Sequence, residues 1–180
     1  MSMFPDRPQP VLIAGVGNPD RGDDGFGPAV ASRLAGLSLP GVEATPCRRP
    51  IDLLDLWQGR GLVFVADAAL AQGAPGRLHR LDALRDRLPP TSSSSTHSFG
   101  LAQAIELGRS LGLLPSRLIL YAAEARSFAP GAPLSPPMRS AVEAAVRRIA
   151  RECGGAVETD PSASHRFAGR SPSASPGILP

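Results

Sequence analysis

Short apolar runs alternate along the chain with segments whose apolar residues recur at helical spacing. Residues 11–14 and 62–66 are continuous apolar runs, which is typical of strands buried on both faces. Phe26, Val30 and Leu34 recur every fourth residue and predict one face of a helix. The chain is therefore expected to begin with a buried strand, a glycine-rich turn and a helix.

The rest of the chain continues this alternation. Further strands are expected at residues 42–45 and 117–122, and a strand with one wet face, typical of a sheet edge, at residues 76–81. Three more helices are expected, with these apolar faces: Ile51, Leu54 and Trp57; Leu101, Ile105 and Leu111; Met138, Val142, Ala145, Val146 and Ile149. Strands joined to helices by short loops predict an α/β sandwich with a mostly parallel sheet of about five strands.

The composition divides the 180 residues into one domain and a tail. Residues 1–155 are expected to form a single α/β domain, because 42% of the chain is hydrophobic and its length suits one core. Residues 156–180 are rich in Ser, Pro and Ala, and they contain too few apolar side chains to offset the entropy of ordering. This tail is predicted to be disordered.

Charge and cysteine content narrow the possible partners and the compartment. The net charge is only +3, the arginines are scattered and aromatic residues make up 4%, so no nucleic-acid partner is expected. Cys47 and Cys153 lie far apart without Cys-x-x-Cys spacing, which suits a reducing cytoplasm. No apolar run approaches the ~18 residues of a membrane helix, and the first run is too short for a signal peptide. The prediction is a soluble cytoplasmic protein.

Three polar residues are expected at the same edge of the sheet. Asp24 follows the first strand, Asp67 closes the strand at residues 62–66, and His97 precedes a helix. Open α/β sheets bind ligands at the carboxyl ends of their strands. Two carboxylates and one imidazole could hold a divalent transition metal, which would polarise a carbonyl or activate water. Spacing alone does not show that the three residues meet.

Simpler interpretations apply to each of these residues. Acidic pairs in turns often cap the next helix or stay solvated, and a lone histidine at a helix start is often a surface residue. His79 and His165 are interpreted as structural or surface residues, and Cys47 as a loop residue.

A nucleotide-binding enzyme is the weaker alternative. Gly15, Gly17 and Gly22 are one or two residues away from a dinucleotide-binding spacing, and the acidic residue expected after the second strand is missing. The chain contains no lysine, so it has no Walker-type phosphate loop, and it has no Gly-x-Ser-x-Gly elbow.

Three motifs, in order along the chain, resemble those of the hydrogenase maturation proteases, which trim the large subunit of nickel–iron hydrogenases. They are Gly15-Val-Gly17-Asn18 with Asp23-Asp24-Gly25-Phe-Gly27, Val63-Phe-Val-Ala-Asp67-Ala68, and Thr96-His97-Ser-Phe-Gly100-Leu101. The resemblance covers residues 11–149. It implies a three-layer sandwich, in which a twisted sheet has helices on both faces.

The resemblance also implies a site and a substrate. Asp24, Asp67 and His97 would contact the nickel of the precursor, and Asp24 and Asp67 are the candidate catalytic residues. Nickel could polarise the scissile carbonyl, or a carboxylate could act as base on water. No nucleotide cofactor is implied, and the protein is expected to be a monomer. The family often has an Asp-Gly-Gly-Thr-Gly-like loop where this chain has residues 46–50, which leaves the identity of the hydrogenase open.

Two functions from different classes follow from this likeness. The first is a peptidase that removes the C-terminal extension of a nickel-loaded [NiFe]-hydrogenase large subunit. The alternative is a chaperone-like protein that inspects the metal of the large subunit without cutting the chain.

Overall fold

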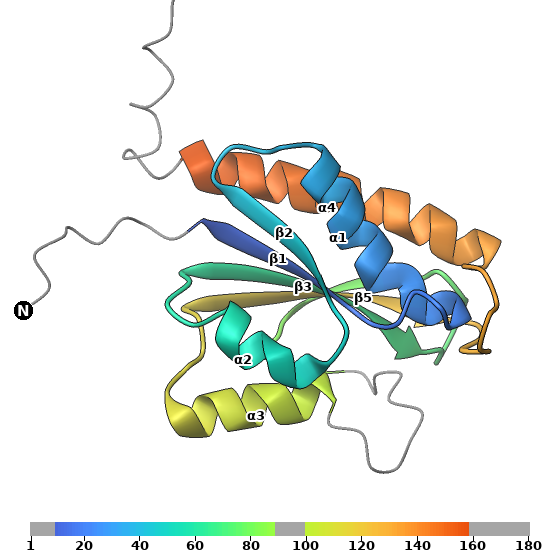
Figure 1. Ribbon diagram of the computed structural model, residues 1–180, viewed down its shortest axis with the longest axis horizontal. Helices are drawn as coiled ribbons and strands as arrows, with labels where there is room; N and C mark the ends of the chain where they lie inside the picture. Colours follow the sequence, from blue (N-terminus) through green and yellow to red (C-terminus); the bar gives the residue numbers. More distant parts are fainter. Residues whose placement is uncertain (1–9, 89–99, 159–180) are drawn as a thin grey trace, which may run out of the picture.

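The computed structural model, which describes residues 10–88 and 100–158, has one five-stranded sheet with strand order β2-β1-β3-β5-β4 (Figure 1). The strands are β1 Val11–Val16, β2 Val42–Cys47, β3 Leu62–Leu70, β4 Leu78–Asp82 and β5 Arg117–Ala125. Four strands run parallel, and only β4, at one edge, pairs antiparallel with its neighbour β5. The predicted mostly parallel sheet, with an edge strand near residues 76–81, is confirmed.

Helices cover both faces of this sheet, so the predicted three-layer sandwich is also confirmed (Figure 1). The helices are α1 Phe26–Gly36, α2 Leu53–Leu56, α3 Leu101–Leu111 and α4 Pro136–Glu158, and two 3₁₀ turns, η1 Gly22–Gly25 and η2 Pro50–Asp52, lead into α1 and α2. Helices α1 and α4 pack on one face, and α2 and α3 on the other.

Alternation along the strands explains why both faces are apolar. On β1, Leu12 faces α2 and α3 while Ile13 faces α1 and α4, and both are fully buried. The predicted face of α1, with Phe26, Val30 and Leu34, is buried against the second of these cores. The helical and strand periodicities of the sequence therefore correspond to real buried surfaces.

The four parallel strands extend further than the sequence predicted: β1 to Val16, β2 to Cys47, β3 to Leu70 and β5 to Ala125. The expected end of β3 at residue 66 is wrong, because pairing with β5 continues from Asp67 opposite Ala122 to Leu70 opposite Ala125. Pairing of β3 with β1 does stop at Ala66. Asp67 is thus the first β3 residue beyond the β1 ladder, rather than the residue that closes the strand.

The second strand, β2, also runs to Cys47, so Cys47 is a strand residue and not a loop residue. Pro46 lies within β2 opposite Gly15. A proline is tolerated there because β2 is at the edge of the sheet and needs to donate to no further strand.

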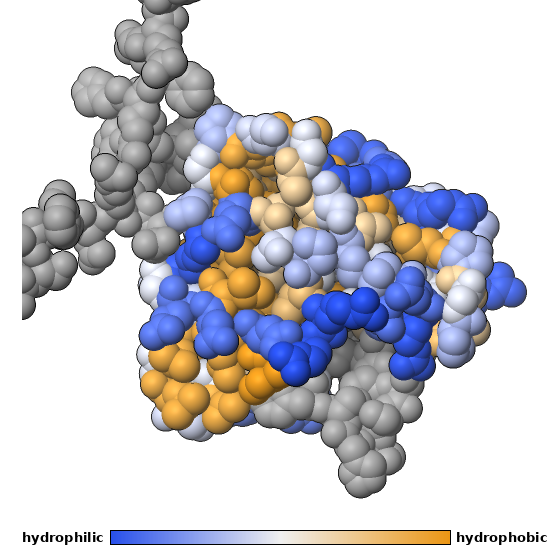
Figure 2. Space-filling view, in the orientation of Figure 1, coloured by the Kyte–Doolittle hydropathy of each residue, from blue (hydrophilic) through white to orange (hydrophobic). Residues whose placement is uncertain are grey.

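The helices differ from the prediction in length and in one contact. The helix expected after Pro50 is only the turn η2 followed by α2, although Leu54 and Trp57 do pack into the core. Leu111, assigned to the buried face of its helix, is 58% exposed. It belongs to the C-terminal end of α3, where hydrophobic surface is visible in Figure 2.

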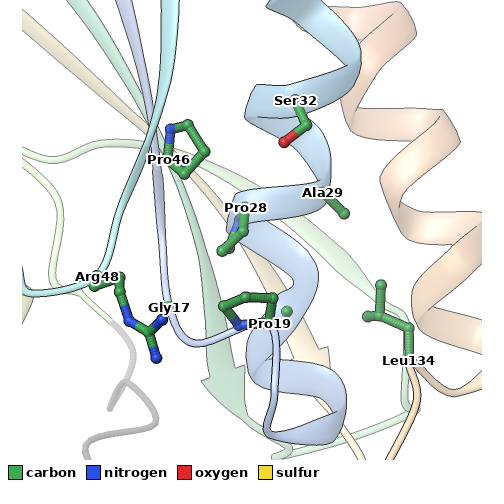
Figure 3. A pocket seen from close by; sticks show the side chains of 9 residues that line it. Gly17, Pro19, Pro28, Ala29, Ser32, Pro46, Arg48 and Leu134 are labelled. Atoms are coloured by element: carbon green, nitrogen blue, oxygen red, sulfur yellow. The ribbon is translucent and has the colours of Figure 1, made fainter.

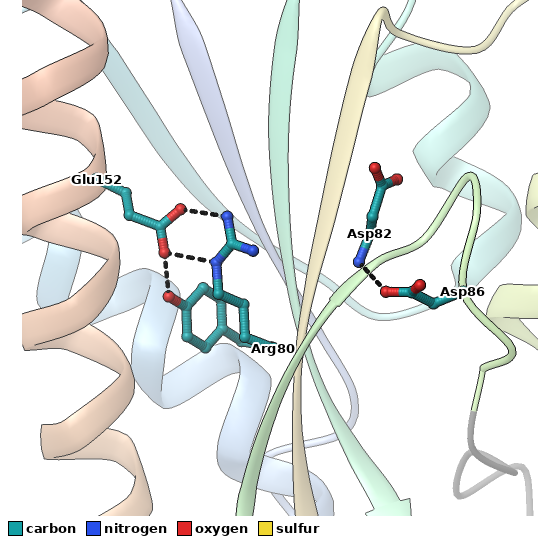
Figure 4. Close-up of polar contacts among 5 residues, drawn as sticks. Arg80, Asp82, Asp86 and Glu152 are labelled. Carbon is teal, nitrogen blue, oxygen red and sulfur yellow. Dashed lines mark hydrogen bonds and ion pairs between the residues drawn. The ribbon is translucent and has the colours of Figure 1, made fainter.

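The edge strand β4 is attached to α4 by a polar network (Figure 4). Arg80 donates two hydrogen bonds of 2.8 Å to the carboxylate of Glu152 on α4, and the hydroxyl of Tyr121 donates to the same carboxylate. The guanidinium of Arg80 is the main reason that the pKa of Glu152 is lowered. This network fixes β4 against the rest of the sheet.

In the described part of the chain, no helix is long and apolar enough to cross a membrane. Helix α4 continues to Glu158, just past the domain end expected at residue 155. Residues 159–180, most of the expected tail, lie outside the described residues, so the disorder of this tail stays a prediction.

Candidate active site

The turn after β1 places Asp24 at the carboxyl end of the parallel strands. Gly17 has a φ of 133°, and a Cβ on it would lie 2.1 Å from the backbone oxygen of Asp24. The backbone N–H of Asn18 donates a 2.9 Å hydrogen bond to Oδ2 of Asp24. Gly17 is therefore required for the close packing of the turn against the residue that carries the carboxylate.

Gly27, at the start of α1, has a similar role. A Cβ there would lie 2.1 Å from the oxygen of Val16 and 2.4 Å from the oxygen of Ala66. Absence of a side chain thus lets α1 begin directly against β1 and β3. Backbone atoms of the chain itself lie where a Cβ of Gly17 or Gly27 would be. Close packing of the backbone therefore explains these two glycines without a bound nucleotide.

Asp23, the neighbour of Asp24, is a structural residue. It is 1% exposed, and its carboxylate accepts backbone N–H groups from Arg126 (2.7 Å), Ser127 (3.1 Å) and Ser135 (2.8 Å). Burial alone would raise the pKa of Asp23, but these hydrogen bonds outweigh burial and the pKa is lowered. Asp23 therefore joins the η1 turn to the loop between β5 and α4.

Asp67 is buried in a different environment. It is 3% exposed, and burial raises its pKa well above the ordinary value. The charge of Asp24 raises the pKa of Asp67 further, while the backbone N–H of Ala68 offsets part of the effect. The carboxyl groups of Asp24 and Asp67 are thus near enough to repel each other, and a site of this kind favours either a bound proton or a bound cation.

The third predicted residue, His97, lies outside the described residues. The description resumes at Gly100, the N-cap of α3, and α3 begins at the carboxyl edge of the sheet (Figure 1). Within the described residues alone, no three His, Cys, Asp or Glu side chains are grouped as metal ligands. The structure therefore brings together two of the three predicted residues, and the place of His97 stays a prediction.

A groove of about 440 Å³ lies next to the turn that carries Asp24 (Figure 3). Gly17, Pro19 and Pro28 form part of its largely apolar wall, and Pro46 and Arg48 border it from the end of β2. The Nη2 of Arg48 donates a 3.0 Å hydrogen bond to Oδ1 of Asn18. Residues 46–50, in which the chain departs from the family pattern, thus border a groove beside a candidate site residue.

Cys47 is near Asp67 but is not suited to nucleophilic attack. Its side chain is buried at the end of β2, and its thiol donates to the backbone oxygen of Arg49 at 3.1 Å. Burial, and to a lesser extent the charges of Asp52 and Asp67, raises the pKa of Cys47 to about 11. At neutral pH the thiol stays protonated, and the nucleophile of a cysteine protease is the thiolate.

Sequence reasoning missed the residue paired with His79. The Nε2 of His79 lies 2.9 Å from Oε1 of Glu124, which is buried near the end of β5. His79 is half-buried rather than a free surface residue. A glutamate inside the apolar strand β5 was the signal that could have revealed the pair, because such a carboxylate needs a buried partner.

Comparisons with known proteins agree with this architecture. A sequence model described as hydrogenase maturation protease matches residues 49–152, which is more than half of the chain. The search of curated proteins found no match.

Several solved structures resemble the chain. The hydrogenase 2 maturation peptidase from Thaumarchaeota archaeon SCGC_AB-539-E09 is 31% identical with a TM-score of 0.57, and the match covers 81% of this chain and 98% of that one. The [NiFe] hydrogenase maturation protease HycI from Thermococcus kodakarensis KOD1 is 25% identical with a TM-score of 0.62 and coverage of 81% and 93%. The fold is also that of the endopeptidase HybD from E. coli, with 23% identity, a TM-score of 0.65 and coverage of 82% and 93%.

Fold and sequence matches together define the class of the protein as a peptidase built on a three-layer α/β sandwich. More narrowly, the chain belongs to the hydrogenase maturation protease family. The resemblance that the three sequence motifs indicated is thereby confirmed.

Proposed function

We propose that the protein removes the C-terminal extension of a [NiFe]-hydrogenase large subunit after nickel has been inserted. The observation that carries this proposal is the pair of carboxyl groups, Asp24 and the buried Asp67, at the carboxyl edge of the sheet. The names of the related structures, which include hydrogenase maturation peptidases and a [NiFe] hydrogenase maturation protease, supply the substrate class.

Asp24, Asp67 and His97 would hold the nickel of the substrate. Carboxylate oxygen and imidazole nitrogen are suitable ligands for such an ion. Asp67 holds its proton to a higher pH than an ordinary aspartate, and it releases that proton when a cation takes its place. Recognition of nickel is therefore expected to weaken as the pH falls.

Cleavage requires a nucleophile and a polarised carbonyl. Nickel supplies Lewis acidity to the scissile carbonyl. Asp24 or Asp67 acts as the base that accepts the proton of the attacking water. The raised pKa of Cys47 supports water as the nucleophile in this scheme. Cleavage would thus follow only after the metal has reached its place in the precursor.

The proposed setting is the cytoplasm, with the protein acting as a monomer without a nucleotide cofactor. Cys47 and Cys153 are both free and belong to the cores on opposite faces of the sheet, which suits a reducing compartment.

Incubation with nickel-loaded and nickel-free precursor tests this function. We expect a loss of mass at the C-terminus of the nickel-loaded precursor only, measured on the intact protein by mass spectrometry. A stable complex with no loss of mass would instead identify a chaperone-like protein that inspects the metal. Absence of both cleavage and binding, with precursor shown to contain nickel, would contradict the proposal.

A further inference from the structure

A second pocket, of about 370 Å³, lies between the ends of β3 and β5 and the edge strand β4. Its charged and titratable lining residues are Arg77, His79, Arg87 and Glu124. We call this set the arginine pocket. None of these four residues has a part in the metal chemistry proposed above.

The sheet register places the arginine pocket beside the candidate active site. Asp67 on β3 is opposite Ala122 on β5, and Ala122 is in turn opposite His79 on β4. Two residues further along β3, Ala69 is opposite Glu124 and lines the pocket. Residues two apart on a strand point to the same face and are separated by about 7 Å. The pocket therefore starts about two residues of extended peptide away from Asp67.

The negative charge of Glu124 is directed into the protein. Its Oε2 accepts the backbone N–H groups of Gln72 (3.2 Å) and Gly73 (2.6 Å), and its Oε1 accepts from His79 at 2.9 Å. The bond from His79 is the main cause that lowers the pKa of Glu124, against the opposing effect of burial. Glu124 therefore stays ionised with its hydrogen-bonding capacity used, and it positions the ring of His79.

The positive charges of the pocket are carried by exposed side chains. Arg77 and Arg87 are both exposed, and neither forms an ion pair with another described residue. Because Nε2 of His79 donates to a carboxylate, its Nδ1 is the ring nitrogen that remains for a ligand. The two guanidinium groups carry two positive charges against the single negative charge of Glu124, which leaves the pocket an excess of positive charge. Guanidinium groups bind carboxylates with two parallel hydrogen bonds.

We propose that the arginine pocket binds an acidic side chain of the peptide substrate, located two or three residues from the scissile bond. This inference rests on the proposed function for the direction of the peptide, because the scissile bond is placed at Asp24 and Asp67. Recognition of the acidic side chain fixes the register of the peptide, so that the scissile bond lies at the two carboxyl groups.

A titration with short peptides tests the pocket without any cleavage. The probes are acetyl-Ala-Glu-Ala-amide and its Gln and Lys analogues, followed by NMR signals of the His79 ring and the Gly73 amide. We expect saturable shifts with the Glu peptide and at least ten-fold weaker binding of the Gln and Lys peptides. The Arg77→Gln/Arg87→Gln double variant should lose the response, while Arg109→Gln, on the distant end of α3, should retain it.

Equal shifts with Glu and Lys peptides, or no shift at 10 mM peptide, would overturn the inference. A Glu peptide that binds no better than acetate would show a general anion site and would also overturn it. Reversal of charge then tests the precursor itself. Wild-type protein should cut slowly a precursor whose acidic residue is changed to Lys. The Arg77→Glu/Arg87→Glu variant should restore cleavage of that altered precursor. If wild-type protein cuts no precursor at all, the proposed function fails, whereas the peptide titration still reports on the pocket.

Discussion

Asp23 and Asp67 are both buried aspartates at the carboxyl edge of the sheet, yet their environments differ in kind. Three backbone N–H groups surround the carboxylate of Asp23, and they lower its pKa in spite of burial. Burial and the neighbouring charge of Asp24 instead raise the pKa of Asp67. A carboxylate that the fold has already satisfied serves the structure. One that is buried next to a second carboxyl group is prepared for an external proton or cation.

The largest effect on the free energy of unfolding is expected from substitution of Asp23. Asp23→Ala leaves three backbone N–H groups without their acceptor, and each buried group that loses its partner costs about 1–3 kcal/mol. We expect the free energy of unfolding, measured with urea, to fall by about 3 kcal/mol or more. Asp24→Ala is the matched control from the adjacent position and should change it by about 1 kcal/mol or less. A larger loss at Asp24 than at Asp23 would reverse the assigned roles.

In the metal-free protein, substitution of Asp67 is expected to change the free energy of unfolding by a smaller amount and in the opposite direction, toward higher stability. Because its folded pKa is raised, Asp67 favours the folded state most below the unfolded pKa near 4, and this contribution is lost as the pH rises. Asp67→Asn has no charge to bury and should be more stable than wild type at pH 7, by on the order of 1 kcal/mol. This advantage should vanish toward pH 4.

Thermal unfolding of Asp67→Asn and wild type between pH 4 and 8 checks this sign. The contribution of Asp23 has the opposite dependence: its lowered pKa means that it stabilises the fold above the unfolded pKa and is lost in acid. If Asp67→Asn destabilises the protein equally at every pH, Asp67 is a structural residue like Asp23.

The smallest effect on cleavage is expected at Cys47, a buried thiol whose pKa is raised in part by the charge of Asp67. Cys47→Ser should leave the rate of precursor cleavage within about two-fold of wild type, since the buried thiol is protonated at neutral pH. A moderate loss of stability, of about 1 kcal/mol, is expected from a hydroxyl in this buried place. Loss of cleavage in a folded Cys47→Ser protein would point to a cysteine nucleophile.

The spacing of apolar residues predicted most of the fold, because buried strands are continuous apolar runs and buried helix faces have apolar residues three or four positions apart. Phe26, Val30 and Leu34 show this on α1. The end of β3 was missed, because strand pairing of residues 67–70 depends on β5, more than 50 residues later in the sequence.

The site was partly predictable. Asp24 and Asp67 follow from topology and from the family motifs, and the effect of the Asp24 charge on the pKa of Asp67 supports the pairing. The separate role of Asp23 could not be read from adjacent carboxylates, because its partners lie more than 100 residues away. The pair of His79 and Glu124 was hidden for the same reason, since the two residues meet only across antiparallel strands.

Cleavage of nickel-loaded precursor by Asp67→Asn shows whether Asp67 serves function rather than folding. The substitution keeps the size of the side chain and removes the charge that would meet the metal or the water. We expect a folded protein, with a melting temperature at pH 7 equal to or above that of wild type, that cleaves at least 100-fold more slowly. His97→Ala should behave alike. Cleavage by a folded Asp67→Asn protein at the wild-type rate would show that Asp67 has no role in cleavage.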